Sequence, residues 1–164
     1  MTFIQVSWII ISVFGLMRSF FLNRRIQFNS EEKEFLQEKF PALSKPLARE
    51  LLNRGVWISG DPGTILTKQG VENSHLIFLR SGSADVMIND DIIAQCEPGN
   101  FIGEMTLHDG SPASATVRLR EESRYLNFDA NGLRELSKRE SLIAQALDAS
   151  FARDLRKKLH AKNP

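Results

Sequence analysis

Short apolar runs separated by turn signals fill the segment from Val56 to Asp129. In chain order the runs are VWIS, TILTK, HLIFLR, ADVMI, DIIAQC, NFI, SATVRLR and RYLNF. The turn signals between them include DPG at 61–63, SGS at 81–83 and EPG at 97–99. Runs of this length and spacing are typical of strands joined by tight turns. The pattern predicts eight strands in a small β-barrel or sandwich.

Helical patterns flank these strands on both sides. Before them lie EEKEFLQEKF (31–40), with Asn29 or Ser30 as its N-cap, and KPLARELLNRG (45–55). After them lie NGLRELSKRE (131–140) and a longer stretch over 141–161. In that last stretch, apolar residues four apart form one face: Ile143, Leu147, Phe151, Leu155 and Leu159. We expect this helix to close over a binding pocket or to pair with a second copy of the chain.

The first 25 residues differ in composition from the rest of the chain. The run from Phe3 to Leu22 carries one charge, Arg18, and a helix of that length spans about 30 Å, the thickness of the hydrocarbon layer. Arg24 and Arg25 follow it, which by the positive-inside tendency places the C-terminal side in the cytoplasm. The sequence therefore predicts a membrane anchor over 1–25 and a domain over 26–164 on the cytoplasmic side. The alternatives are a helix lying in the membrane interface or one docked on the folded domain.

The apolar run also contains Gly15 and Ser19, a pair of small residues four apart. Such pairs let helix backbones approach closely in lipid. A homo-oligomer formed through the N-terminal and C-terminal helices is one expectation, and a chance occurrence of the pair is the alternative.

Charge and motif content exclude several classes of function. Lys and Arg number 21 against 20 Asp and Glu, a net charge of +1, so nucleic acid is not an expected partner. A single cysteine, Cys96, rules out an internal disulfide framework. The chain lacks the serine-hydrolase, P-loop and zinc-protease motifs, and His75, His108 and His160 are scattered singly. We therefore expect no enzyme, no catalytic residue, no metal site and no cofactor.

The stretch GEMTLHDGSPASATV, residues 103–117, has a shape that suits the capture of a small anion. Gly103 permits a sharp turn. The short helix expected from Glu104 would point main-chain N–H groups at a ligand. Met105 and Leu107 are expected to pack the turn onto the strands. Yet the stretch contains no arginine and no lysine.

An ordered set of segments resembles the cyclic-nucleotide-binding domain of catabolite activator proteins and protein kinase A regulatory subunits. The segments are DPGTILTKQG (61–70), LIFLRSGSADV (76–86) and EPGNFIGEMTLHDGSPASATV (97–117). The resemblance covers roughly residues 28–160. It implies a mainly β fold with flanking helices: an eight-stranded jelly-roll β-barrel, here preceded by an apolar N-terminal helix.

The resemblance also implies a ligand and a site. An ionised Glu104 is a pure acceptor and suits a ribose hydroxyl, the role of its counterpart in the family; the alternative is a cap or ion pair that holds the turn. Ser114 and the main chain of Ala115 can donate to phosphate oxygens. The implied ligand is cyclic AMP or another cyclic nucleotide, and the implied ligand-binding residues are Gly103, Glu104, Met105, Ala113, Ser114 and Ala115.

One position departs from the family pattern. The family has an arginine just before the pair occupied by Ser114 and Ala115, and this chain has Ala113. A bidentate guanidinium makes two charge-assisted bonds of roughly 1.5–3 kcal/mol each, so its loss predicts binding weaker by about two orders of magnitude or more. Arg118, on the same strand face as Ser114, starts about 13 Å away and is a poor substitute.

The Popeye family, whose members are membrane-anchored, is similar in placing such a barrel after membrane helices and in lacking that arginine. Some of its members are held to bind cyclic AMP nonetheless. The sequence thus predicts a membrane-anchored, cyclic-nucleotide-binding-like sensor or regulatory domain in signal transduction, with an atypical phosphate-binding cassette. The alternative is a degenerate barrel that no longer binds nucleotide and acts as a protein interaction or assembly module.

Overall fold

The computed structural model describes residues 26–161, without the side chains of 158–161. The chain divides into two compact units, Met1–Glu50 and Leu51–Pro164. Three predictions lie at or outside the edge of the described residues and stay untested. They are the domain boundary at residue 25, the apolar helix over 1–25 and its Gly15–Ser19 pair.

The described part of the first unit is helical. The helix α2 (Ser30–Lys39) begins with a capping box: Asn29 Oδ1 accepts from the Glu32 N–H at 2.8 Å, and Glu32 Oε2 accepts from the Asn29 N–H at 2.9 Å. Of the two predicted caps, Asn29 is therefore the one used. The next helix, α3 (Lys45–Leu52), is tied to α2 by a 2.8 Å ion pair between Arg49 and Glu32. The Arg49 guanidinium, which donates to the Glu32 carboxylate, holds the pKa of Glu32 below its ordinary value.

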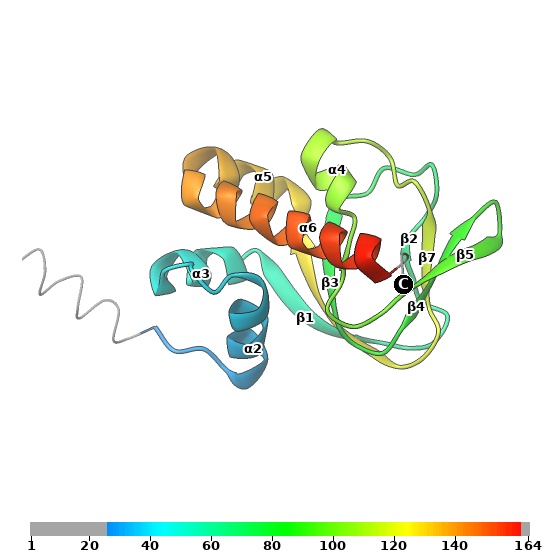
Figure 1. The fold of residues 1–164 in the computed structure, drawn as a ribbon, viewed down its shortest axis with the longest axis horizontal. Helices are drawn as coiled ribbons and strands as arrows, with labels where there is room; N and C mark the ends of the chain where they lie inside the picture. The colour runs from blue at the N-terminus through cyan, green and yellow to red at the C-terminus, as the bar shows by residue number, and fades with distance from the viewer. Residues whose placement is uncertain (1–25, 162–164) are drawn as a thin grey trace, which may run out of the picture. The chain divides into compact units, whose positions relative to one another are not determined.

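The second unit contains the eight predicted strands. They are β1 (Gly55–Gly60), β2 (Ile65–Thr67), β3 (His75–Ser81), β4 (Ala84–Ile88), β5 (Asp91–Cys96), β6 (Phe101–Ile102), β7 (Thr116–Leu119) and β8 (Ser123–Asp129). They pair antiparallel in two four-stranded sheets, with the orders β1-β8-β3-β6 and β2-β7-β4-β5 (Figure 1). The mainly β jelly-roll-like fold is confirmed.

The predicted closure into one barrel is corrected to two sheets. Among the described strands, β1 and β6 are the edges of one sheet, and β2 and β5 are the edges of the other. A barrel requires such edges to pair with each other, and β6 is only two residues long. The two sheets share one core, because buried apolar side chains of both pack in a single cluster: Ile77, Leu79, Ala84, Cys96, Ile102, Val117, Leu119 and Tyr125.

Three helices complete the described part of the second unit (Figure 1). The short helix α4 (Glu104–Asp109) interrupts the chain between β6 and β7, and α5 (Ala130–Arg139) and α6 (Ser141–Ala161) follow β8. The carboxylate of Asp129 caps α5 by accepting from the Gly132 N–H at 3.0 Å. The predicted apolar face of α6 is buried at Ile143 and Leu147, but Leu155 is 59% exposed.

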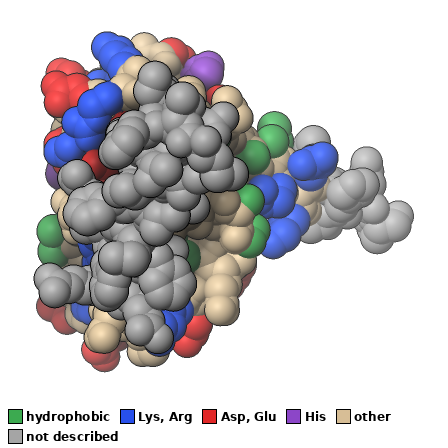
Figure 2. All heavy atoms as spheres, turned by 90° about the vertical axis from the view of Figure 1, so that its left-hand side faces the viewer, with side chains coloured by type: hydrophobic (Ala, Val, Ile, Leu, Met, Phe, Trp, Pro, Cys, Tyr) green, Lys and Arg blue, Asp and Glu red, His purple; other side chains and the backbone are tan. Residues whose placement is uncertain are grey.

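The predicted membrane location, with the domain on the cytoplasmic side, is wrong by the structure. In the part of the chain that the structure describes, no helix combines the length and apolar character that a bilayer span requires. The helix α6 has 21 residues, but its C-terminal half carries charged side chains of both signs. The run from Phe3 to Leu22, on which the prediction rested, lies outside the described residues. In the space-filling view, acidic and basic side chains lie on the same face (Figure 2).

Candidate functional site

The larger cavity of the second unit has a volume of about 550 Å³. Strands of both sheets, α4 and the segment between α4 and β7 contribute to its wall. All six residues predicted to bind a ligand line it: Gly103, Glu104, Met105, Ala113, Ser114 and Ala115. The fold therefore brings the two ends of the predicted cassette together around one space. Its volume lies in the range of about 300–1,000 Å³ that is usual for small-molecule sites.

Gly103 stands at the turn from β6 into α4, in the left-handed conformation (φ 89°, ψ 17°). A Cβ there would lie 2.7 Å from both Asn73 Nδ2 and the main-chain oxygen of His75, so a larger residue does not fit without movement. The two groups that face Gly103 are hydrogen-bonded to each other: the Asn73 side chain donates to His75 O at 2.8 Å and accepts from His75 N at 3.1 Å. Asn73 is buried and lines the cavity. A lone asparagine in a loop carries no sequence signal for such a role.

The helix α4 is only six residues long and is held at its C-terminal end by α5. The guanidinium of Arg134 donates to Leu107 O at 3.2 Å, to Thr106 O at 3.3 Å and to Asn131 Oδ1 at 2.6 Å. The bond to Leu107 O supplies a partner for a carbonyl of the last turn and complements the helix dipole, whereas Thr106 O also accepts from the Gly110 N–H at 2.9 Å. The opposite end, from Gly103 to Thr106, lines the cavity.

Main-chain hydrogen bonds join the segment after α4 to the loop after β2. The main chain of Ala113 is used twice, because its N–H donates to Val71 O at 3.0 Å and its oxygen accepts from Gly70 N at 2.8 Å. Ala115 O accepts from the Thr67 hydroxyl at 3.1 Å. Ala113 is thus anchored by its main chain on both sides of the peptide unit.

A turn stabilised by a carboxylate precedes this segment. Asp109 Oδ1 accepts from the Ser111 N–H at 2.9 Å and from the Ser111 hydroxyl at 2.6 Å. Donation from the Ser111 side chain, and next from its N–H, lowers the pKa of the Asp109 carboxyl below its ordinary value. The chain reverses after α4 at Gly110, which has the left-handed φ of 73°.

The charged side chains among the described residues of the larger cavity wall are acidic. Among the described residues that line it, the charged side chains are Glu97 and Glu104, and no lysine, arginine or histidine is present. Arg118 lies on β7, opposite Asp85 of β4 in the register of the two strands. It is not among the residues that line the cavity. Apolar side chains form another part of the wall: Val86, Ala94, Cys96, Phe101, Ile102 and Val117.

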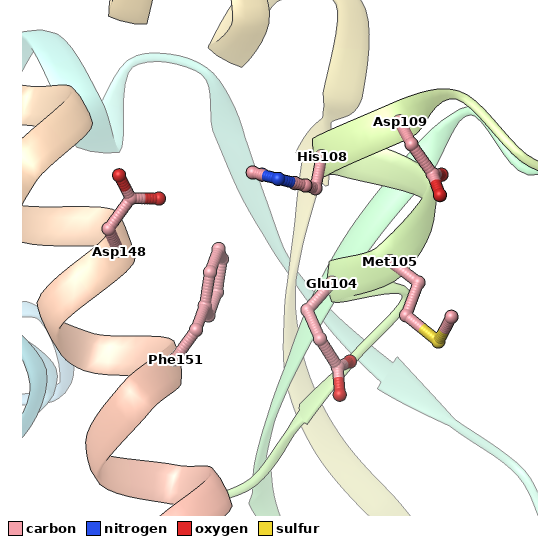
Figure 3. A pocket seen from close by; sticks show the side chains of 6 residues that line it. All are labelled: Glu104, Met105, His108, Asp109, Asp148 and Phe151. Atoms are coloured by element: carbon pink, nitrogen blue, oxygen red, sulfur yellow. The ribbon is translucent and has the colours of Figure 1, made fainter.

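A second cavity of about 310 Å³ lies between α4 and α6. Its lining residues are Glu104, Met105, His108, Asp109, Asp148 and Phe151 (Figure 3). Figure 3 shows the His108 ring directed from α4 toward the α6 side of this space, where Asp148 and Phe151 stand. Met105 is 60% exposed rather than packed on the strands, so that expectation is corrected; Leu107, 8% exposed, does pack inward.

Known proteins match this arrangement. The family model described as the cyclic nucleotide-binding domain matches residues 58–140, half of the chain. The cGMP-dependent protein kinase of Plasmodium berghei is 30% identical over 116 residues, which covers 67% of this chain and 14% of the kinase. The Pycsar effector protein XpPycTIR of Xanthomonas perforans is 23% identical over 125 residues, which covers 76% of this chain and 41% of the effector. The chain thus spans less than half of either curated relative.

Among solved structures, a candidate cyclic nucleotide-binding protein from Geobacter metallireducens superposes with a TM-score of 0.72. The two chains are 19% identical, and the match covers 81% of this chain and 100% of the other. At this identity the likeness shows the fold alone.

Proposed function

This chain belongs to the cyclic nucleotide-binding domain family, and we propose that it is a sensor or regulatory module that binds its ligand in the 550 Å³ cavity through a cassette without arginine. The observation that carries the proposal is the convergence on that cavity of Gly103, Glu104 and the segment from Ala113 to Ala115. We propose binding rather than catalysis as the activity. From the Popeye family we carry over only the missing arginine, since the membrane location is contradicted.

The proposed ligand is a cyclic nucleotide that binds weakly. Main-chain N–H groups in the first turn of α4 and the hydroxyl of Ser114 would contact its phosphate, and Glu104 would accept from its ribose. With Ala113 in place of the arginine, the strongest charge-assisted contact is missing. We expect dissociation constants of roughly tens of micromolar or higher.

Calorimetric titration of the full chain with cyclic AMP and cyclic GMP tests the proposal. Ala113→Arg supplies the guanidinium and should tighten binding of cyclic AMP by about tenfold or more, at about 1.4 kcal/mol per decade. Glu104→Ala in that background should abolish the gain, because the ribose contact is lost. Ala149→Arg, an added charge at an exposed position of α6, is the matched control. It should leave binding unchanged.

An interaction or assembly module is the second candidate. It is favoured by Ile92 and Ile93, which are 55% and 57% exposed on β5, an edge strand. Exposed apolar side chains on an open strand edge are typical of sites that pair with another chain. Absence of heat and of any thermal shift with wild type and both variants would favour this candidate over the sensor.

A further inference from the structure

Two of the four methionines lie in the described part of the chain, and they differ in exposure. Met105, in the first turn of α4, is 60% exposed. Met87, on β4, is half-buried and stands opposite Ile92 and Thr116 in the two neighbouring strands. Because oxidation of a methionine requires access of the oxidant to the sulfur atom, Met105 is the more reactive of the two.

We propose that Met105 is a modification site whose oxidation to the sulfoxide by a hydroperoxide weakens ligand binding in the 550 Å³ cavity. The thioether sulfur attacks one peroxide oxygen and gives up two electrons as the S–O bond forms. The O–O bond breaks, and the second oxygen takes the proton of the first and leaves as water or as an alcohol. The effect on binding rests on the proposed function, whereas the modification itself does not.

The position of Met105 gives the modification its effect. The residue lines both the larger cavity and the cavity between α4 and α6. Figure 3 shows its side chain directed away from Phe151 and α6. It belongs to the cassette itself, next to Glu104 in the first turn of α4. An oxygen added to its sulfur therefore alters the wall of the proposed binding site.

Oxidation replaces an apolar group in this wall by a polar one. The sulfoxide oxygen is a hydrogen-bond acceptor, which water satisfies in the free protein. A ligand that covers Met105 removes that water. The phosphodiester of a cyclic nucleotide presents only acceptors in its place, so a polar atom is buried without a donor, at a cost in free energy. Binding of the cyclic nucleotide becomes weaker for this reason.

The fold does not depend on the oxidised atom. The helix α4 is held by its neighbours Thr106 and Leu107, which are buried, and by Arg134 of α5, which donates to their main-chain oxygens. Sulfoxide formation disrupts a protein when the sulfur lies in its core, whereas Met105 lies at the surface. We therefore expect oxidation of Met105 to shift the thermal midpoint by less than about 2 °C.

The experiment treats the full chain with hydrogen peroxide and follows each methionine by peptide mass spectrometry. Met105 should be converted at least about threefold faster than Met87, in keeping with its exposure. Calorimetry before and after the treatment should show that cyclic AMP binds about fivefold more weakly to the oxidised protein. Methionine sulfoxide reductase should restore the original affinity.

Two variants isolate the contribution of Met105. Met105→Leu keeps an apolar side chain of similar volume without the sulfur, so peroxide should no longer change its affinity for cyclic AMP. Met105→Gln makes the position permanently polar and should bind cyclic AMP as weakly as the oxidised protein. Met87→Leu is the matched control, and its affinity should remain sensitive to peroxide.

Three outcomes would overturn different parts of the proposal. Faster oxidation of Met87 than of Met105 would overturn the assignment of the site. Equal cyclic AMP affinity before and after conversion of Met105 would overturn the effect on binding while supporting the proposed sensor function. Absence of heat and of thermal shift with cyclic AMP and cyclic GMP in the untreated protein would overturn the sensor function, and the effect on binding with it.

Discussion

The rings of Phe101 and Phe151 meet edge to face, with centroids 5.2 Å apart and planes at 90°. Phe101, on β6, lines the larger cavity, and Phe151, on α6, lines the second cavity. The pair therefore docks the C-terminal helix on the strand that leads directly into the cassette. A displacement of the Phe101 ring in the cavity wall would therefore act directly on α6 through its contact with Phe151.

Phe151→Ala should loosen the C-terminal half of α6. The half-buried ring contributes its apolar surface and an edge-to-face contact of about 0.5–1.5 kcal/mol, so we expect a destabilisation of about 1–3 kcal/mol. Amide hydrogen exchange over residues 148–157 and the thermal midpoint measure it. Leu155→Ala, at a position 59% exposed, should cost less than about 0.5 kcal/mol. Changed sedimentation with unchanged exchange would instead indicate that Phe151 pairs two copies of the chain.

Arg134→Met should release α4 from α5. Helices of six residues are unstable alone, and the guanidinium donates to two carbonyls at the end of this one, of which Thr106 O also accepts from the Gly110 N–H. We expect a loss of about 1–2 kcal/mol, with faster amide exchange in α4. Arg134→Lys should recover only part of the loss, because an ammonium group cannot reproduce the planar set of donors. Arg139→Met, in a side chain 58% exposed, removes the same charge and should leave α4 unchanged.

Gly103→Ala should distort the entry to the cassette, and Gly63→Ala provides a matched comparison. Both glycines have similar left-handed φ values, 89° and 87°, so both substitutions carry a backbone cost of about 1–2 kcal/mol. A Cβ at Gly63 meets nothing within 4 Å, whereas one at Gly103 lies 2.7 Å from Asn73 Nδ2. Chemical denaturation should therefore show an additional loss of about 1 kcal/mol or more for Gly103→Ala. Equal losses of stability in the two variants would contradict this, because they would show that the Asn73 side chain moves aside at no cost.

The turn at Asp109 should respond to acid. Hydrogen bonds from Ser111 lower the pKa of Asp109 below its ordinary value of 3.8. A lowered pKa means that the stabilisation is present above the ordinary value and is lost as the pH falls through the lowered one. An NMR titration of the Asp109 carboxyl carbon measures this, and Ser111→Ala should move the midpoint back up. A midpoint that does not respond to Ser111→Ala would contradict the hydrogen bonds as the cause.

The eight strands and the helix boundaries were predictable because their signals are local. Runs of β-branched and aromatic residues bounded by turn residues specify a strand whatever lies beside it. The observed strands lie over the predicted runs, and α4 begins at Glu104, as the motif indicated. The choice between Asn29 and Ser30 as the cap of α2 also follows a local rule, since the capping box joins residues three apart. Gly103 was recognisable for the same reason, because a glycine before a short helix marks a turn that other residues rarely adopt.

Only the tertiary structure decided which of these elements meet. The arrangement in two sheets depends on which strands pair with strands that are distant in the sequence. No local pattern specifies these partners. The roles of Asn73 and Arg134 arise from contacts with residues distant in sequence; Arg134 and Thr106 are 28 positions apart. The exposure of Met105 and the placing of Glu97 and Glu104 at one cavity also follow from packing. Propensity and turn chemistry act over a few residues, whereas a binding site is defined by side chains that the folded chain brings together from several elements.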